Sequence, residues 1–304
     1  FPPLTMVSSR LFLVLFFNSS SVAFTLVASN LPSRSHRGVQ STSKIYSGNG
    51  NLEGSLSSSI LKKDLLSAIP SIPFGAPATN LTISQESLDG IQRIACNLEL
   101  LTPLPPLSKS PKALQALDGD WQLVFSDASE ITKISKLPLG FRLGPVFQCI
   151  DVNDGRFENQ ALIKHKLFIL SGHTRVIADF FLAPLGEVNR IGVKNIGSRA
   201  NVKFKKVIFS LRRFLLIPTF GKVRKTAIPN GPSEQKGVIP SIDITYLDNT
   251  MRISRGGDGS LFILTKYGQQ IKKAMPMLPK EIVEQIAVND AAPTYDASVD
   301  ILPS

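Results

Sequence analysis

The chain has 304 residues, 43% hydrophobic and 19% charged, which is enough for one large globular domain or two small ones. This composition excludes a wholly disordered chain and a fibrous repeat. Two cysteines and three histidines also exclude a disulfide-stapled small fold and a four-thiolate zinc site, and we expect neither a metal nor a cofactor.

The net charge of +11 lies in one stretch of the sequence. Residues 188–233 contain eleven Lys and Arg and no Asp or Glu, so the remaining 23 basic residues balance the 23 acidic ones. We therefore expect an anionic partner, whether lipid headgroup, nucleic acid or acidic protein, to bind in this stretch.

The amino end has the pattern of a two-part targeting leader. Residues 1–23 carry one basic residue, Arg10, then a seven-residue apolar run and small polar residues, the layout of a signal peptide. Residues 24–55 are Ser-rich and basic, with no acid in 24–51, as in a transit peptide. With Ala23 before Phe24, the leader resembles that of algae with a red-algal plastid. The alternative is a secretory signal with a Ser-rich spacer. No later apolar run reaches transmembrane length.

Residues 60–106 predict a helical preface and a Pro-rich link. Apolar residues recur at helical spacing from Ile60 to Ile69, where Pro70 ends the first helix. Ser84 precedes a second helix to about Leu101, and three prolines follow it.

Residues 117–268 predict an antiparallel β-barrel or sandwich. The apolar period changes to two at Trp121, and short β-branched or aromatic runs follow, separated by turn residues with no helix between them. The glycines of 255–259 predict a tight hairpin between strands at 251–254 and 260–265. Residues 269–304 predict a short closing helix at 281–288 and a frayed tail.

Four segments, in this order, resemble the plastid lipid-associated protein (PAP)/fibrillin family. They are the helical preface at 60–106, LDGDWQLVFS at 117–126, GPVFQCID at 144–151 and ITYLDNTMRISRGGDGSLFIL at 244–264. The resemblance implies a mainly β, lipocalin-like antiparallel barrel (α+β) behind two N-terminal helices. It also implies a plastid protein, peripheral on plastoglobules or thylakoids, that is not an enzyme and associates with lipids: carotenoid, quinone or acyl lipid.

Two other functions stay open. One is a soluble carrier of an isoprenoid or acyl ligand, or a partner of a plastid lipid enzyme. The weaker one is nucleic-acid binding through residues 190–225, where basic and aromatic residues interleave. No hydrolase, metalloprotease or nucleotide-binding motif is present in the sequence.

Inward-facing aromatic residues are candidates for a ligand cavity. Trp121 either plugs the core or forms the floor of such a cavity, and a barrel of this size can be filled or hollow. The candidate set is Trp121, Phe125, Phe147, Phe204, Tyr246 and Phe262.

Basic residues between 203 and 213 are candidates for an anionic or membrane surface. Val202 and Phe204 alternate with lysines, so we expect the lysines to face outward, and 212–217 to form a loop that dips into lipid or a strand end. The candidate set is Lys203, Lys205, Lys206, Arg212 and Arg213.

The RGGDG hairpin could hold a phosphate or carboxylate through an arginine. We expect instead a structural turn with glycines at positive φ, in which Arg255 pairs with Asp258 or Asp248. The residues of this motif are Arg252, Arg255, Gly256, Asp258 and Gly259.

Overall fold

The computed structural model describes residues 50–101, 104–129, 131–132, 140–167, 169–214, 217–227, 239–266 and 274–286. Within these ranges the side chains of 50–56, 220–225 and 227 are not described. Nearly all of the expected leader and the tail beyond 286 lie outside the described residues.

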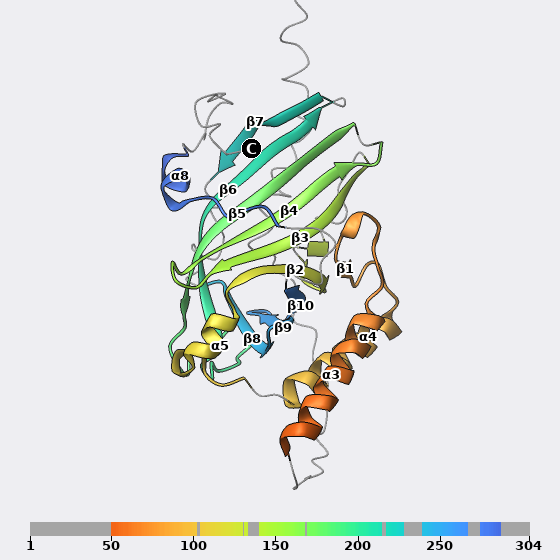
Figure 1. The fold of residues 1–304 in the computed structure, drawn as a ribbon, viewed down its shortest axis with the longest axis vertical. Coiled ribbons are helices and arrows are strands. Elements are labelled where there is room, and N and C mark those ends of the chain that lie inside the picture. The colour runs from red at the N-terminus through yellow and green to blue at the C-terminus, as the bar shows by residue number, and fades with distance from the viewer. Residues whose placement is uncertain are drawn as a thin grey trace, which may run out of the picture.

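The described part of the chain is mainly β sheet with a few helices (Figure 1). The helices are α3 (Gly50–Ala68), α4 (Gln85–Leu101), α5 (Pro111–Ala116) and α8 (Lys280–Gln285), with short 3-10 turns η1 (Pro73–Gly75) and η2 (Leu107–Lys109). The strands are β1 (Ala78–Thr79), β2 (Gly119–Ser126), β3 (Phe141–Asp151), β4 (Arg156–His165), β5 (Leu170–Leu182), β6 (Arg199–Phe214), β7 (Ile217–Ala227), β8 (Ser241–Leu247), β9 (Met251–Gly256) and β10 (Leu261–Lys266).

Eight strands close into a ring. They pair in the order β2-β10-β9-β8-β6-β5-β4-β3, and β3 pairs back with β2. Every pairing in the ring is antiparallel, as expected from the sequence. β7 adds to β6 outside this path and β1 adds in parallel to β2. Because the sheet closes on itself, it buries one face inside the ring without leaving the eight strands as free edges.

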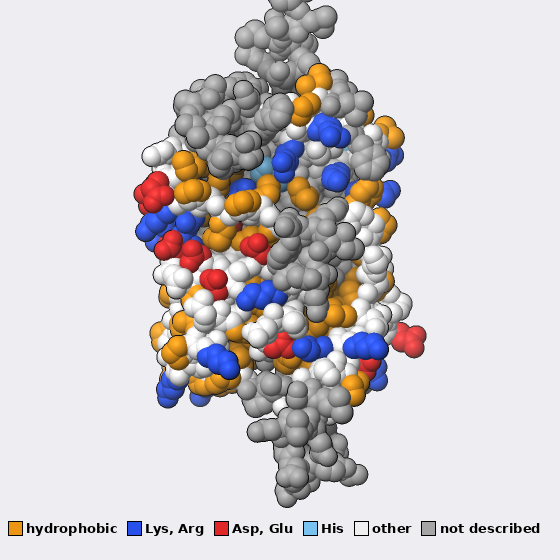
Figure 2. All heavy atoms as spheres, in the orientation of Figure 1, with side chains coloured by type: hydrophobic (Ala, Val, Ile, Leu, Met, Phe, Trp, Pro, Cys, Tyr) orange, Lys and Arg blue, Asp and Glu red, His pale blue; other side chains and the backbone are white. Residues whose placement is uncertain are grey.

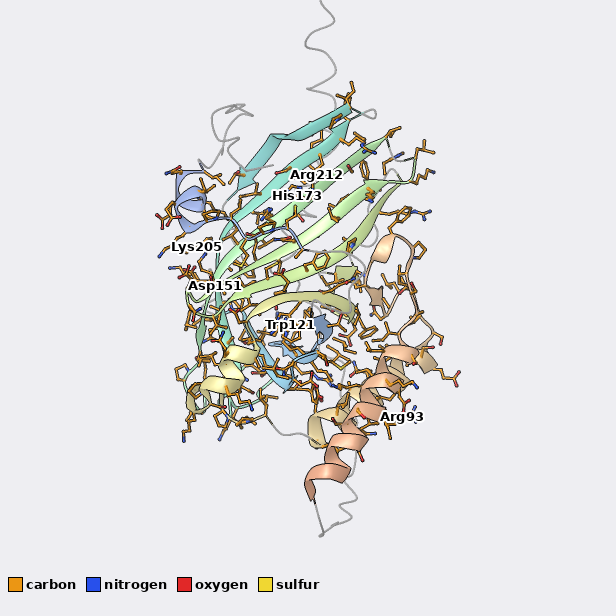
Figure 3. All side chains as sticks on the ribbon, viewed as in Figure 1. Arg93, Trp121, Asp151, His173, Lys205 and Arg212 are labelled. Atoms are coloured by element: carbon orange, nitrogen blue, oxygen red, sulfur yellow. The ribbon has the colours of Figure 1, made fainter. Side chains whose placement is uncertain are left out.

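The inner face of the ring carries the largest apolar cluster. Trp121 and Leu123 of β2 pack there with inward residues of the other strands, among them Phe157, Ala178 and Val202. Figure 3 shows Trp121 among the side chains near β2 and β10. The segment 104–117, with η2 and α5, packs against the same cluster through Leu107 and Leu117.

Helices α3 and α4 cover part of the outer face. Ile91, Ala95 and Leu98 of α4 share one helix face and are fully buried against β2 and β8–β10. The Ser84 hydroxyl accepts a hydrogen bond from the Ser87 backbone N–H at 3.2 Å, which caps the start of α4. The expected start of the first helix at Ile60 was wrong, because α3 already begins at Gly50.

The carboxyl end covers another part of the outer face, over β4–β6. Val283 and Ile286 pack on Ile177 and Ile208, and α8 lies beside the sheet in Figure 1. Glu158, completely buried, pairs with Arg175 and accepts a hydrogen bond from the Leu278 backbone N–H at 3.1 Å. The expected helix at 281–288 is shorter in the structure and ends at Gln285.

Candidate functional site

A cavity of about 290 Å³ lies inside the ring. Its wall is mostly apolar and is built from inward side chains of β2–β6 and β8–β10. The apolar lining includes Leu123, Leu143, Val146, Ile150, Phe157, Val176, Phe180, Val202, Phe204, Ile244, Phe262 and Leu264. Its exposed lining residues, Arg190, Ile239 and Asp258, mark where the cavity meets the protein surface.

The structure brings some of the six cavity candidates together. Phe147, Phe204 and Phe262 are among the lining residues. Trp121 is fully buried in the inner cluster, and its indole N–H donates to the Leu117 carbonyl at 2.8 Å. Leu117 and Leu123, which belong to the same cluster as Trp121, line the cavity, whereas Trp121 does not. Trp121 therefore supports the cavity wall from behind.

Phe125 and Tyr246 are on the other face, in the cluster under α3 and α4. Register shifts between paired strands place these two side chains on the outer face. The pairing of β2 with β10 slips between Ile263 and Leu264, and that of β8 with β9 slips between Ile244 and Tyr246. A one-residue slip moves the following side chains to the opposite face. Alternation alone therefore placed both aromatic residues wrongly.

Among the described residues, Arg252 is the charged group in the interior part of the cavity wall. It is 2% exposed, and its guanidinium lies 5.1 Å from the centre of the Trp121 ring, in a cation–π contact. One terminal N–H₂ donates to the Gln148 side-chain oxygen, while Nε has no hydrogen-bond partner among the described residues. Burial lowers the pKa of Arg252 to about 9. The sequence placed Arg252 in the structural hairpin motif, but in the structure its side chain points into the ring.

The polar side chains that line the cavity with Arg252 include Gln148, Asn159 and Ser254. The Gln148 amide N–H₂ donates to Asn159 Oδ1 at 3.0 Å, so the two amides and Arg252 form one chain of hydrogen bonds. Ser254, two residues along β9 from Arg252, is fully buried, and its hydroxyl also has no partner among the described residues. The interior thus combines apolar walls with a small polar cluster, the usual make-up of a ligand pocket.

The β5–β6 connection, residues 183–198, exposes apolar side chains near the cavity mouth. Leu185, Val188, Ile191, Val193 and Ile196 are between 49% and 75% exposed. Arg190 and Lys194 are exposed beside them, and Arg190 also lines the cavity. We call residues 183–198 the apolar loop. Contiguous exposed apolar side chains are uncommon on soluble proteins and mark interaction sites.

Polar groups behind the apolar loop hold it in place. Arg199, 1% exposed, pairs with Asp243 at 2.7 Å and donates to the carbonyls of Glu187 and Val193. The Asn195 amide donates to two loop carbonyls, and Asn201 donates to the Glu187 carboxylate at 3.0 Å. The carboxylates of Glu187 and Asp243 are thus engaged with interior partners.

The five basic surface candidates divide into two groups. Lys203, Arg212 and Arg213 are exposed, and basic side chains lie among hydrophobic ones over the upper ends of the long strands in Figure 2. Lys205 pairs with Asp179 at 2.7 Å, and Lys206 donates to the carbonyls of Val283 and Ile286.

Lys206 therefore holds the carboxyl end on the sheet, instead of facing a partner as we expected. Of the two structures expected at 212–217, a loop or a strand end, residues 212–214 form a strand end, because β6 continues to Phe214. β7, which begins at Ile217, was not expected. Ile217 is 66% exposed. Within 212–217, residues 215 and 216 lie outside the described part.

Most of the RGGDG motif has structural roles in this protein. Arg255 pairs with Glu99 of α4, its Nε at 3.0 Å from Oε1, so the expected pairing with Asp258 or Asp248 was wrong. The reason is that Arg255 faces outward, toward α4, and away from the turn. The Asp258 carboxylate accepts from the Ser260 N–H and hydroxyl, and Gly259 has φ +87°. A Cβ on Gly256 would clash with Asp258 and Ser260.

The family model PAP_fibrillin matches residues 59–265, the helical preface and the whole ring. The chain belongs to the PAP/fibrillin family. This membership indicates a plastid lipid-associated protein, from a family known as structural and non-catalytic. A search of the curated proteins found no match, and neither did a search of the solved structures.

Two further observations concern membrane and metal. Of the helices in the described ranges, none combines the length and apolar character needed to cross a bilayer. Within the same ranges, no three His, Cys, Asp or Glu side chains come together as metal ligands.

Proposed function

We propose that this PAP/fibrillin protein binds one lipid inside its ring, as a lipocalin-like barrel does, and docks on plastid lipid surfaces with the apolar loop. The observation that carries the proposal is the apolar cavity, whose mouth lies beside that loop at Arg190. A docked protein would then open its cavity toward the lipid phase, so that a ligand can exchange without crossing water.

Charge and rigidity support docking through the apolar loop. Glu187 and Asp243 turn away to bond Asn201 and Arg199, so the exposed charges of the loop are Arg190 and Lys194. Each basic residue near an anionic lipid surface contributes about 1 kcal/mol. Because interior groups already order the loop, little conformational entropy is lost when its apolar side chains enter the headgroup region.

The cavity size favours an acyl lipid over the other classes that we considered. At about 290 Å³ it lies at the small end of ligand pockets. A single acyl chain suits this volume better than a whole carotenoid or prenylquinone, which would need a larger one.

The exposed basic residues of β6 give a second candidate surface. The apolar loop precedes Arg199, the first residue of β6, whereas Arg212 and Arg213 lie near the other end of this strand. The two surfaces are therefore about 40 Å apart along β6. A soluble carrier that meets a partner protein through the apolar loop, and nucleic-acid binding through β6, remain the alternatives.

Flotation with vesicles of galactolipid and phosphatidylglycerol tests the docking surface. The double variant Ile191→Asp/Ile196→Asp should lose binding, since both side chains are at least 53% exposed and the fold does not need them. The matched control is Ile60→Asp, 52% exposed on α3, which should bind as the unchanged protein does.

A second pair of charge changes separates the two surfaces. Loss of binding in Arg212→Glu/Arg213→Glu, with the loop variant unaffected, would move the contact to β6. Binding through β6 would also fall steeply with salt, because exposed charges are screened over about 8 Å at physiological ionic strength. Comparable affinity for single-stranded DNA would favour the nucleic-acid alternative.

Import into a plastid is the other part of the proposal. A fluorescent fusion to residues 1–60 should enter the plastid, and Phe24→Ala should stall it outside. Normal import of the Phe24 variant would remove the argument for a two-part leader of the red-algal type.

A further inference from the structure

We propose that the ligand of the cavity is a long-chain carboxylic acid, whose carboxylate binds Arg252 and Ser254 while its hydrocarbon chain fills the apolar part. This inference rests on the proposed function and names the chemical class of the ligand. It is carried by two buried polar atoms, Arg252 Nε and Ser254 Oγ, which have no hydrogen-bond partner among the described residues.

The charge of the cavity wall favours an anionic ligand. Of the ionisable residues that line the cavity in the described part of the chain, Arg190 and Asp258 are exposed at the mouth, and Arg252 alone is buried in the wall. No Asp or Glu of the described residues forms an ion pair with Arg252. A buried cation without a counter-ion is unfavourable. An anionic ligand in the cavity would supply the missing charge, whereas a neutral carotenoid, quinone or ester would leave Arg252 uncompensated.

Two hydrogen-bond donors in the cavity wall are available to a ligand. Arg252 Nε–H and the Ser254 hydroxyl have no partner among the described residues, and both side chains face the cavity from β9. A carboxylate has two oxygens that only accept hydrogen bonds, so it matches two donors. Gln148 and Asn159 already bond each other and are not required for this role.

The Arg252 guanidinium is already oriented by its neighbours. Trp121 lies 5.1 Å behind the guanidinium, and Gln148 accepts from one of its terminal nitrogens. Two separate contacts thus hold the guanidinium before any ligand arrives. Such preorganisation reduces the entropy lost on binding.

The carboxylic acid would bind with its head at the wall and its chain in the apolar space. Arg252 and Ser254 share β9, and the apolar side chains of β3–β6, such as Phe157, Val176 and Phe204, also line the cavity. A tail among these residues buries apolar surface, which contributes roughly 25 cal/mol per Å². Head and tail are thus recognised by different chemistry, and this allows them to be tested separately.

The test compares oleate with methyl oleate, which has the same chain and no charge. Binding of each to the full chain is measured by isothermal titration calorimetry at pH 8, below the concentration at which oleate aggregates. The unchanged protein should bind oleate at least about ten-fold more tightly, as expected for a charge-assisted pair. Arg252→Gln should remove this preference and keep the affinity for methyl oleate.

Two further variants make the result specific. Ser254→Ala should weaken oleate binding several-fold and leave methyl oleate binding unchanged. It removes a buried hydroxyl that has no hydrogen-bond partner among the described residues, so the variant should fold. Arg190→Gln is the matched control, an arginine at the mouth of the same cavity, and should keep the preference for oleate.

The outcomes separate this inference from the proposed function. Equal affinities of the unchanged protein for oleate and methyl oleate would overturn the carboxylate site while supporting an apolar ligand. The carboxylate site would also be overturned if a folded Arg252→Gln variant still preferred oleate. The same holds if Ser254→Ala kept the preference for oleate while Arg190→Gln abolished it. If neither compound binds the unchanged protein, the proposed function itself fails.

Discussion

Trp121 is the side chain whose removal should damage the ring most. It is fully buried, packs in the inner cluster, donates a hydrogen bond to the Leu117 carbonyl and supports the Arg252 guanidinium. Emptying a large aromatic site costs about 3–5 kcal/mol, and losing a hydrogen bond leaves a buried carbonyl unpaired at about 1 kcal/mol. We expect Trp121→Ala to lower the free energy of unfolding by about 4 kcal/mol.

Urea unfolding followed by far-ultraviolet circular dichroism measures this loss. With a slope of about 2 kcal/mol per molar urea, the midpoint should fall by about 2 M. Leu100→Ala, at an 80% exposed position on α4, is the control and should leave the midpoint unchanged. A loss below about 1 kcal/mol for Trp121→Ala would refute the assignment of Trp121 to the core behind the cavity.

Three further predictions concern the outer face and the turn. Glu99→Gln should lower the free energy of unfolding by about 2 kcal/mol, because it weakens the half-buried pair with Arg255; an unchanged urea midpoint would contradict this role. Burial alone would raise the pKa of Asp248, but hydrogen bonds, first from Lys62, outweigh it and lower the pKa from 3.8 to about 2.

The folded protein therefore keeps the stability from Asp248, about 2 kcal/mol, above pH 4 and loses it as the pH falls toward 2. Asp248→Asn should make the free energy of unfolding less dependent on pH between pH 4 and 2. An unchanged pH dependence in this range would contradict the stabilising role of the Asp248 carboxylate. Gly259→Ala should cost about 1 kcal/mol in urea unfolding, since φ is +87° and a Cβ would lie 3.1 Å from Ile191. A neutral result would show that the turn relaxes.

The sequence was sufficient to predict a mainly β fold and the chain order of the eight strands of the ring, but not β7. Alternation of apolar residues identifies strands such as β2, and in β6 it correctly puts Val202 and Phe204 inside the ring. Local spacing also identifies α4. These features depend on the spacing of apolar residues within each segment, so they can be predicted without knowing which distant segments are in contact.

The wrong predictions concern residues whose position is decided by a distant partner and not by the local pattern of apolar residues. The slipped registers that move Phe125 and Tyr246 outward depend on the partner strand and leave no sign in local alternation. Likewise, the partner of Arg255 is Glu99, which lies 156 residues away in the chain.

Two features of the sequence indicate parts of the site that we did not predict from it, namely the inward position of Arg252 and the apolar loop. Arg252 alternates with Met251 and Ile253, which predicts that an arginine faces away from the apolar helix-covered side and into the ring. The apolar loop has hydrophobic residues between its glycines at 186, 192 and 197. Exposed apolar residues in a glycine-rich connection could have been recognised as a candidate docking surface.

The central claim, that a lipid enters the ring, can be tested most directly through the one tryptophan of the chain. Trp121 lies directly behind the cavity wall, next to Arg252. A fatty acid with bromine atoms on its chain quenches tryptophan fluorescence at short range. We predict saturable quenching by dibromostearate, and its loss in Ala161→Phe, which fills part of the cavity. Absence of quenching in the unchanged protein, or equal quenching in the filled variant, would contradict the account.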